Sequence, residues 1–139
     1  MDGYNPAVIS MLRMCYRCHP AILYQPNAMF YDNQLISSAD REVAYNLTSY
    51  THLLKQSFPL IFHGVQGKDC REGSSPSWFN ADEASVVISY VANLLEDSNI
   101  FVSGEEIGII TPYQKQVSKI RRALEIAGYL TTSAFTSTY

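Results

Sequence analysis

Residues 107–114 read IGIITPYQ, a short apolar run followed directly by the start signals of a helix. Thr111 is a preferred N-cap residue, Pro112 suits the first helical position, and Gln114 can complete a capping box. The apolar residues that follow recur at helical spacing: Val117, Ile120, Leu124 and Ala127. Gly128 is a natural helix stop. The stretch therefore predicts a buried strand over 107–110 and a capped helix after it.

The same order of strand and helix occurs once before. Residues 59–65, PLIFHGV, form a compact apolar run, and the polar stretch 66–79 predicts a long loop. Asn80 and Glu83 form a capping box that should open a helix ending near Asp97. Strands that alternate with helices indicate an α/β fold with a parallel sheet, in which ligands bind beyond the carboxyl ends of the strands.

Two patterns in this part imitate nucleotide-site motifs without having their chemistry. Residues 64–69, GVQGKD, have the wrong glycine spacing for a phosphate loop, and Lys68 is followed by Asp69 rather than Ser or Thr. Asp82 and Glu83 stand in the first turn of the expected helix, where negative charge suits the helix dipole. The sequence therefore predicts neither a phosphate loop nor a magnesium-binding acidic pair, and no metal site.

The N-terminal part gives weaker signals. Residues 8–14 fit a strand or a short helix equally well. Pro20 is well placed as the first residue of a helix, which Pro26 should kink or break. Residues 32–33, Asp-Asn, predict a turn, and residues 40–55 are expected to be helical in part.

Length and composition favour one globular domain. The chain has 139 residues, of which 47% are hydrophobic and 17% charged, with a formal net charge of −3. This charge argues against nucleic-acid binding through a broad basic surface, although a few contacts from amides and hydroxyls remain compatible with it. No apolar run is long enough to span a membrane, and the first residues do not resemble a signal peptide. A cytoplasmic location is expected, with the three cysteines reduced.

Tyr16 and Arg17 are the first candidate site residues. A flat aromatic ring beside a fixed cation suits a nucleotide, since the ring can stack on a base and the guanidinium can bind phosphate oxygens. From these two residues alone, the structural interpretation, a half-buried Tyr and a surface Arg after a strand, is favoured. The CxxCH pattern of Cys15, Cys18 and His19 also matches a haem attachment site, but such attachment requires export, and a zinc site would need a further ligand.

The turn of Thr111, Pro112 and Tyr113 is the second candidate. A capped helix start has a structural role in any protein, yet it also presents free amides and a partial positive charge to an anion. At the ligand edge of a parallel sheet, such a turn can contact a phosphate group.

Several segments in order resemble the second RecA-like domain of Upf-like superfamily-1 helicases. They are residues 16–20 (YRCHP), 26–31 (PNAMFY) and 107–113 (IGIITPY). Residues 58–69 (FPLIFHGVQGKD), 71–73 (REG) and 75–80 (SPSWFN) resemble more particularly the Armitage-like RNA helicases. The likeness extends over most of the chain and implies a P-loop NTPase-type, RecA-like parallel sheet flanked by helices.

The resemblance also implies an activity and its site. Members of the family hydrolyse ATP with magnesium while moving 5′ to 3′ along single-stranded RNA, and the Armitage-like group acts in small-RNA silencing and RNA granules. By this likeness Tyr16 stacks on the adenine, and Arg17 reaches the γ-phosphate across the cleft from the first RecA-like domain. Thr111, Pro112 and Tyr113 lie in the RNA channel. The implied partners are single-stranded RNA, the first RecA-like domain and small-RNA silencing proteins.

The chain also departs from the family. The phosphate loop and the acidic pair of the first RecA-like domain are missing from the sequence, and residues 129–139 do not match the expected nucleic-acid motif. We therefore expect an incomplete second RecA-like domain over 1–128, a divergent or disordered tail over 129–139, and a helicase fragment that is inactive alone. The alternative is a non-catalytic protein- or RNA-interaction module that keeps the fold.

Overall fold

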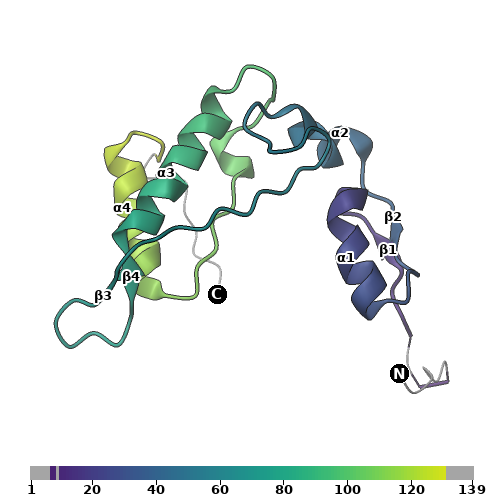
Figure 1. Cartoon of the computed structure of the whole chain (residues 1–139), viewed down its shortest axis with the longest axis horizontal. Coiled ribbons are helices and arrows are strands. Elements are labelled where there is room, and N and C mark those ends of the chain that lie inside the picture. The colour runs from purple at the N-terminus through teal and green to yellow at the C-terminus, as the bar shows by residue number, and fades with distance from the viewer. Residues whose placement is uncertain (1–6, 9, 131–139) are drawn as a thin grey trace. The chain divides into compact units, whose positions relative to one another are not determined.

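A computed structural model describes residues 7, 8 and 10–130 of the chain. They form a mixed α/β structure that divides between Ile61 and Phe62 into two units, each with its own internal contacts (Figure 1). Each unit is described by itself. No helix of the described residues is long and apolar enough to cross a membrane.

The first unit contains a minimal strand–helix–strand arrangement. Strand β1, Met14–Cys15, pairs in parallel with β2, Ile36–Ser37, and helix α1, Pro20–Phe30, lies between them in the chain (Figure 1). Asn27 joins the end of α1 to the chain before β2, because its side chain donates to Leu35 O at 3.1 Å and accepts from Leu35 N at 2.8 Å.

Local sequence signals explain how α1 begins and how the chain turns after it. Pro20 is the first helical residue, as predicted, and His19 Nδ1 caps the helix by accepting from Ala21 N at 3.1 Å. Asp32 and Asn33 both have positive φ angles, 50° and 59°, which confirms the turn.

Three expectations for this unit can be compared with the structure. Residues 8–14 are compatible with a strand or a short helix, and among the described residues this part forms only the short strand Met14–Cys15. Pro26 does not end α1, which continues around it to Phe30, so the prediction of a break is wrong. The expected partial helix over 40–55 is confirmed by helix α2, Arg41–Ala44, and the 3₁₀ helix η1, Asn46–Ser49.

Two helices make the core of the second unit. Helix α3, Ala81–Glu96, packs against α4, Gln114–Ile126, and both are labelled in Figure 1. Four buried residues form the centre of this contact: Ala84, Val91, Ile120 and Leu124. Two residues of the expected apolar stripe of α4, Ile120 and Leu124, therefore lie in the contact with α3.

The predicted loop 66–79 contains one strand of a small antiparallel pair and the first residue of the other strand. Strand β3, Asp69–Cys70, pairs with β4, Phe79–Asn80, directly before α3. A short 3₁₀ helix, η2 over Gly104–Glu106, follows α3, and Ser103 and Glu106 form its capping box.

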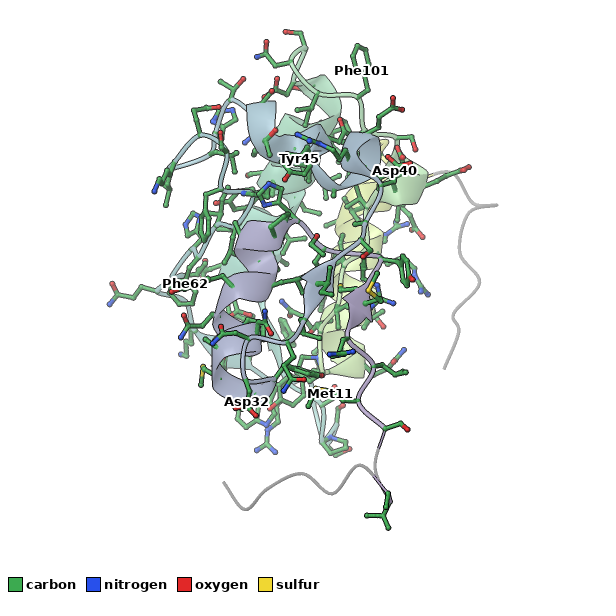
Figure 2. The ribbon with its side chains drawn as sticks, turned by 90° about the vertical axis from the view of Figure 1, so that its right-hand side faces the viewer. Met11, Asp32, Asp40, Tyr45, Phe62 and Phe101 are labelled. Carbon is green, nitrogen blue, oxygen red and sulfur yellow. The ribbon has the colours of Figure 1, made fainter. Side chains whose placement is uncertain are left out.

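The two buried strands expected over 59–65 and 107–110 are not formed. Neither stretch belongs to either of the two-stranded sheets in the described residues. Phe62, labelled in Figure 2, is 92% exposed, and Ile110 is 99% exposed. A strand needs a neighbour for its backbone hydrogen bonds, and the described part of the chain offers none to these segments.

Residues 62–68 are instead held along α3 by side-chain and loop contacts. His63 Nδ1 lies 2.9 Å from Tyr90 Oη, and Lys68 N donates to Asp82 Oδ2 at 3.3 Å. Gly67 passes so close to the start of α3 that a Cβ atom there would be 2.6 Å from Asn80 Oδ1. Only glycine fits this position without displacing the cap of α3.

The helix ends of this unit confirm some sequence signals and correct others. Asn80 Oδ1 caps α3 by accepting from Asp82 N at 3.0 Å and Glu83 N at 3.1 Å, and the helix ends before Asp97 as predicted. However, the backbone N–H of Asn80 donates to Gln116 Oε1 rather than to Glu83. The reciprocal half of the predicted capping box is therefore replaced by a side chain of another helix.

Helix α4 starts later than predicted. Tyr113, with extended backbone, is its N-cap, so the prediction that Thr111 caps the helix and Pro112 begins it is wrong. The hydroxyl of Ser77, from the segment before β4, accepts from Lys115 N at 3.0 Å and does the work of a capping side chain.

Gly128 ends α4 as predicted. Its φ of 80° lets Gly128 N bond to Glu125 O at 3.1 Å and Tyr129 N bond to Leu124 O at 3.0 Å. This is the hydrogen-bond pattern of a Schellman motif. Tyr129 and Leu130 pack against the core, and residues 131–139 of the predicted tail lie outside the described part.

Candidate functional site

Each unit has a cavity lined by residues that the sequence analysis selected. In the first unit a cavity of about 570 Å³ has Tyr16 and Arg17 in its wall. The rest of its lining comes mainly from β1, α1 and the turn after α1: Leu12, Met14, Cys15, Cys18, Leu23, Pro26, Tyr31 and Leu35. Its size is in the range of small-molecule sites.

The turn between β1 and α1 positions Tyr16 and Arg17. They follow the last residue of β1 and precede the cap of α1, so both lie beyond the carboxyl end of a parallel strand, as predicted. Ser37 Oγ anchors the turn by donating to Cys18 O at 3.2 Å. Tyr16 is 72% exposed, and Arg17 is exposed and forms no salt bridge with any described residue. The ring can therefore stack on a flat ligand while the guanidinium binds an anion.

The cysteines beside this pair have structural surroundings. Backbone amides of Arg17 and Cys18 donate to the Cys15 thiol and lower its pKa, whereas burial raises the pKa of Cys18. His19 caps α1 and packs edge-on against Tyr45, with 4.3 Å between the ring centroids. Across the described residues, no group of three or more His, Cys, Asp or Glu side chains could hold a metal ion.

The second unit has a cavity of about 500 Å³ that brings together Thr111, Pro112 and Tyr113. The remaining lining residues come from β3, the β4 region, and the starts of α3 and α4: Asp69, Trp78, Phe79, Asn80, Glu83 and Gln116. The turn predicted to bind RNA therefore forms one part of a walled site. Sequence reasoning did not select Trp78, Phe79 or Gln116 as site residues, and nothing in the spacing of Gln116 marks it.

A buried amide pair holds the walls of this second cavity together. The Gln116 side chain accepts from Asn80 N at 2.8 Å and donates to Asn80 O at 3.1 Å. Asn80 Nδ2 in turn donates to Asp69 Oδ1 at 3.1 Å, which positions that carboxylate. Because Asn80 and Gln116 are both buried, these bonds fix α4, α3 and the β3–β4 pair relative to one another.

Basic side chains hold the segment before β4 on α4. Glu72 forms salt bridges with Lys115, at 2.6 Å, and with Lys119. The Arg71 guanidinium carbon lies 4.5 Å from the centroid of the Trp78 ring. Lys119 Nζ lies 4.7 Å from the centroid of the Phe79 ring. None of these cations lines the cavity itself, and among the described residues its charged lining consists of Asp69 and Glu83.

The Glu72 contacts predict a pH dependence of stability. Hydrogen bonds from Lys115 and Lys119 lower the pKa of Glu72 from 4.5 to about 2. The stabilisation is therefore complete above pH 4.5 and is lost as the pH falls toward 2. Glu72→Gln should lower the urea midpoint at pH 7, and its difference from the wild type should vanish near pH 2.

The matched control is Glu105→Gln, which removes an exposed carboxylate of η2 that forms no salt bridge with the described residues. Its urea midpoint should follow that of the wild type at every pH. A difference between wild type and Glu72→Gln that persists unchanged down to pH 2 would contradict the ion-pair assignment.

Comparison with known proteins gives the family to which this chain belongs. The profile of the AAA domain family matches residues 2–135, and the chain belongs to this family. The human RNA helicase Mov10l1 is 47% identical over 119 residues, which are 86% of this chain and 10% of that protein.

Two further relatives agree. The putative helicase mov-10-B.1 of Danio rerio is 44% identical over 128 residues, 89% of this chain and 13% of the relative. The probable RNA helicase armi of Drosophila melanogaster is 34% identical over 129 residues, 86% of this chain and 11% of the relative. The predicted likeness to Armitage-like RNA helicases is confirmed. The chain spans about a tenth of the length of these curated relatives.

Proposed function

We propose that this chain is a segment of an ATP-dependent RNA helicase, in which it supplies half of the ATP site and part of the single-stranded RNA channel. The observation that carries the proposal is the placement of the two predicted residue sets. Tyr16 and Arg17 line one cavity, and Thr111, Pro112 and Tyr113 line another. The parallel β1–β2 pair around α1 supports a RecA-like arrangement of the first unit.

The ATP half-site would use the exposed pair Tyr16 and Arg17. The Tyr16 ring offers a stacking face for adenine, and Arg17 offers a permanently charged donor fork to the γ-phosphate. The sequence has no phosphate loop and no acidic pair for magnesium. In this proposal the first RecA-like domain supplies both, and Arg17 stabilises the charge that develops during phosphoryl transfer.

The RNA half-site would use the turn before α4. The Thr111 hydroxyl and nearby amides are suited to one backbone contact, and Tyr113 is exposed enough to stack. Small-RNA silencing proteins as partners, and a cytoplasmic or RNA-granule location, belong to the same proposal. The relatives named RNA helicase support the RNA-binding part of this proposal.

A non-catalytic interaction module is the second candidate function. The exposed apolar side chains of Phe62 and Ile110 favour it, because their segments pair with no strand in the described part of the chain. Such groups commonly mark contact surfaces for another chain or domain. The two candidates differ in whether the chain contributes to a catalytic ATP site.

The RNA proposal is tested by titrating labelled oligouridine into the 139-residue chain at several salt concentrations. With a net charge of −3 and few phosphate contacts, we expect a dissociation constant near 10⁻⁴ M or weaker and a shallow salt dependence. Thr111→Ala should weaken this binding further, whereas Thr51→Ala, in the other unit, should not. Submicromolar binding with a steep salt slope would contradict the proposed channel, because it would require a basic surface elsewhere.

A further inference from the structure

We propose that the cavity lined by Trp78 and Tyr113 holds one RNA base and prefers a base with an exocyclic amino group over uracil. The inference rests on the proposed RNA binding and goes beyond it, since it assigns a base pocket, its walls and its preference. A single-stranded RNA channel alone implies neither a pocket for one base nor a preference among bases.

Aromatic rings make this cavity suitable for a flat ligand. Trp78 is 38% exposed and Tyr113 is 47% exposed, and both line the cavity. The Arg71 guanidinium covers one face of Trp78, with 4.5 Å to the ring centroid. A base stacked against the remaining face gains aromatic contact of the kind that binds single-stranded nucleic acids, worth about 1–3 kcal/mol per base.

The charges of the cavity favour a base over a phosphate group. Asp69 and Glu83 are the charged residues in its wall, and no Lys or Arg of the described residues lines it. Lys115 and Lys119 are paired with Glu72 outside the wall. Carboxylates repel phosphate but accept hydrogen bonds, so they select the amino hydrogens of a base.

The Asp69 carboxylate is held where a base edge could meet it. Asn80 Nδ2 donates to Asp69 Oδ1 at 3.1 Å, and Oδ2 makes no hydrogen bond within the described residues. Cytosine can donate its amino hydrogens to such an oxygen. Uracil presents a carbonyl oxygen at the same position, where two acceptors would face each other.

The decisive experiment compares oligocytidine with oligouridine of equal length, since the two pyrimidines stack on similar areas. Trp78 is the single tryptophan of the chain, so its fluorescence reports directly from the cavity. We expect oligocytidine to quench Trp78 and to bind about tenfold more tightly than oligouridine. Anisotropy of end-labelled oligonucleotides measures total binding in the same samples.

Asp69→Asn tests the proposed acceptor while leaving an oxygen for Asn80. It should reduce the preference for cytidine to less than about threefold. Glu105→Gln removes the same charge from η2, outside the cavity, and should leave the preference intact. Circular dichroism confirms that both variants are folded.

The outcomes distinguish a failure of this inference from a failure of the proposed function. Equal affinity for the two oligonucleotides overturns the base preference. Binding by anisotropy without a change in Trp78 fluorescence overturns the pocket and leaves RNA binding by the chain intact. If neither oligonucleotide binds up to millimolar concentration, the proposed RNA function fails together with this inference.

Discussion

Arg17→Ala is expected to lower RNA-stimulated ATP turnover about 10³-fold in a full-length helicase that contains this segment. Arg17 is exposed in the wall of the first cavity and is not neutralised by a salt bridge with any described residue. Its guanidinium is therefore available to a ligand phosphate. Its loss would leave the charge of the transferring phosphoryl group unstabilised, and steady-state phosphate release measures the effect.

Two further substitutions show whether the effect belongs to a nucleotide site. Tyr16→Ala should chiefly weaken nucleotide binding, by about 1–2 kcal/mol of lost stacking, with a smaller change in turnover. Arg13→Ala removes an exposed cation that does not line the cavity and should leave both quantities nearly unchanged. Equal and small effects of Arg17→Ala and Tyr16→Ala would mean that the pair is structural.

Gln116→Ala is expected to lower the free energy of unfolding of the chain by about 2–4 kcal/mol. The Gln116 side chain is 5% exposed, and its amide pairs with both the N–H and the carbonyl of Asn80. Alanine would remove one hydrogen bond from each of these two buried backbone groups and would open a void between α3 and α4. Urea unfolding followed by Trp78 fluorescence measures the loss.

Gln114→Ala is the matched control, because Gln114 is an exposed glutamine in the first turn of the same helix. We expect its effect to stay within about 0.5 kcal/mol. If the two variants were equally stable, the amide pair would not hold the two helices together. Gln116→Glu retains an acceptor for Asn80 N but loses the donor to Asn80 O and buries a carboxylate facing that carbonyl, so it should also be less stable than the wild type.

The sequence by itself determined the features that depend on near neighbours in the chain. Pro20 begins α1, Asn80 caps α3 and Gly128 ends α4, as predicted. Each depends on a residue type that favours one backbone conformation, or on a hydrogen bond that spans a few residues. The family likeness was also readable, because it is carried by short segments in order, and the family match confirms it.

The tertiary structure alone decided where α4 begins and which residues wall its cavity. Ser77 caps α4 from 38 residues away, and Gln116 replaces the expected partner of Asn80 N from 36 residues away. Such partners compete with the local cap at Thr111, and sequence spacing does not reveal which bond forms. The apolar runs 59–65 and 107–110 have the composition of buried strands, but residues 7, 8 and 10–130 offer them no neighbouring strand with which to form a ladder. Whether an apolar run becomes a strand depends on such a partner, which the run itself does not contain.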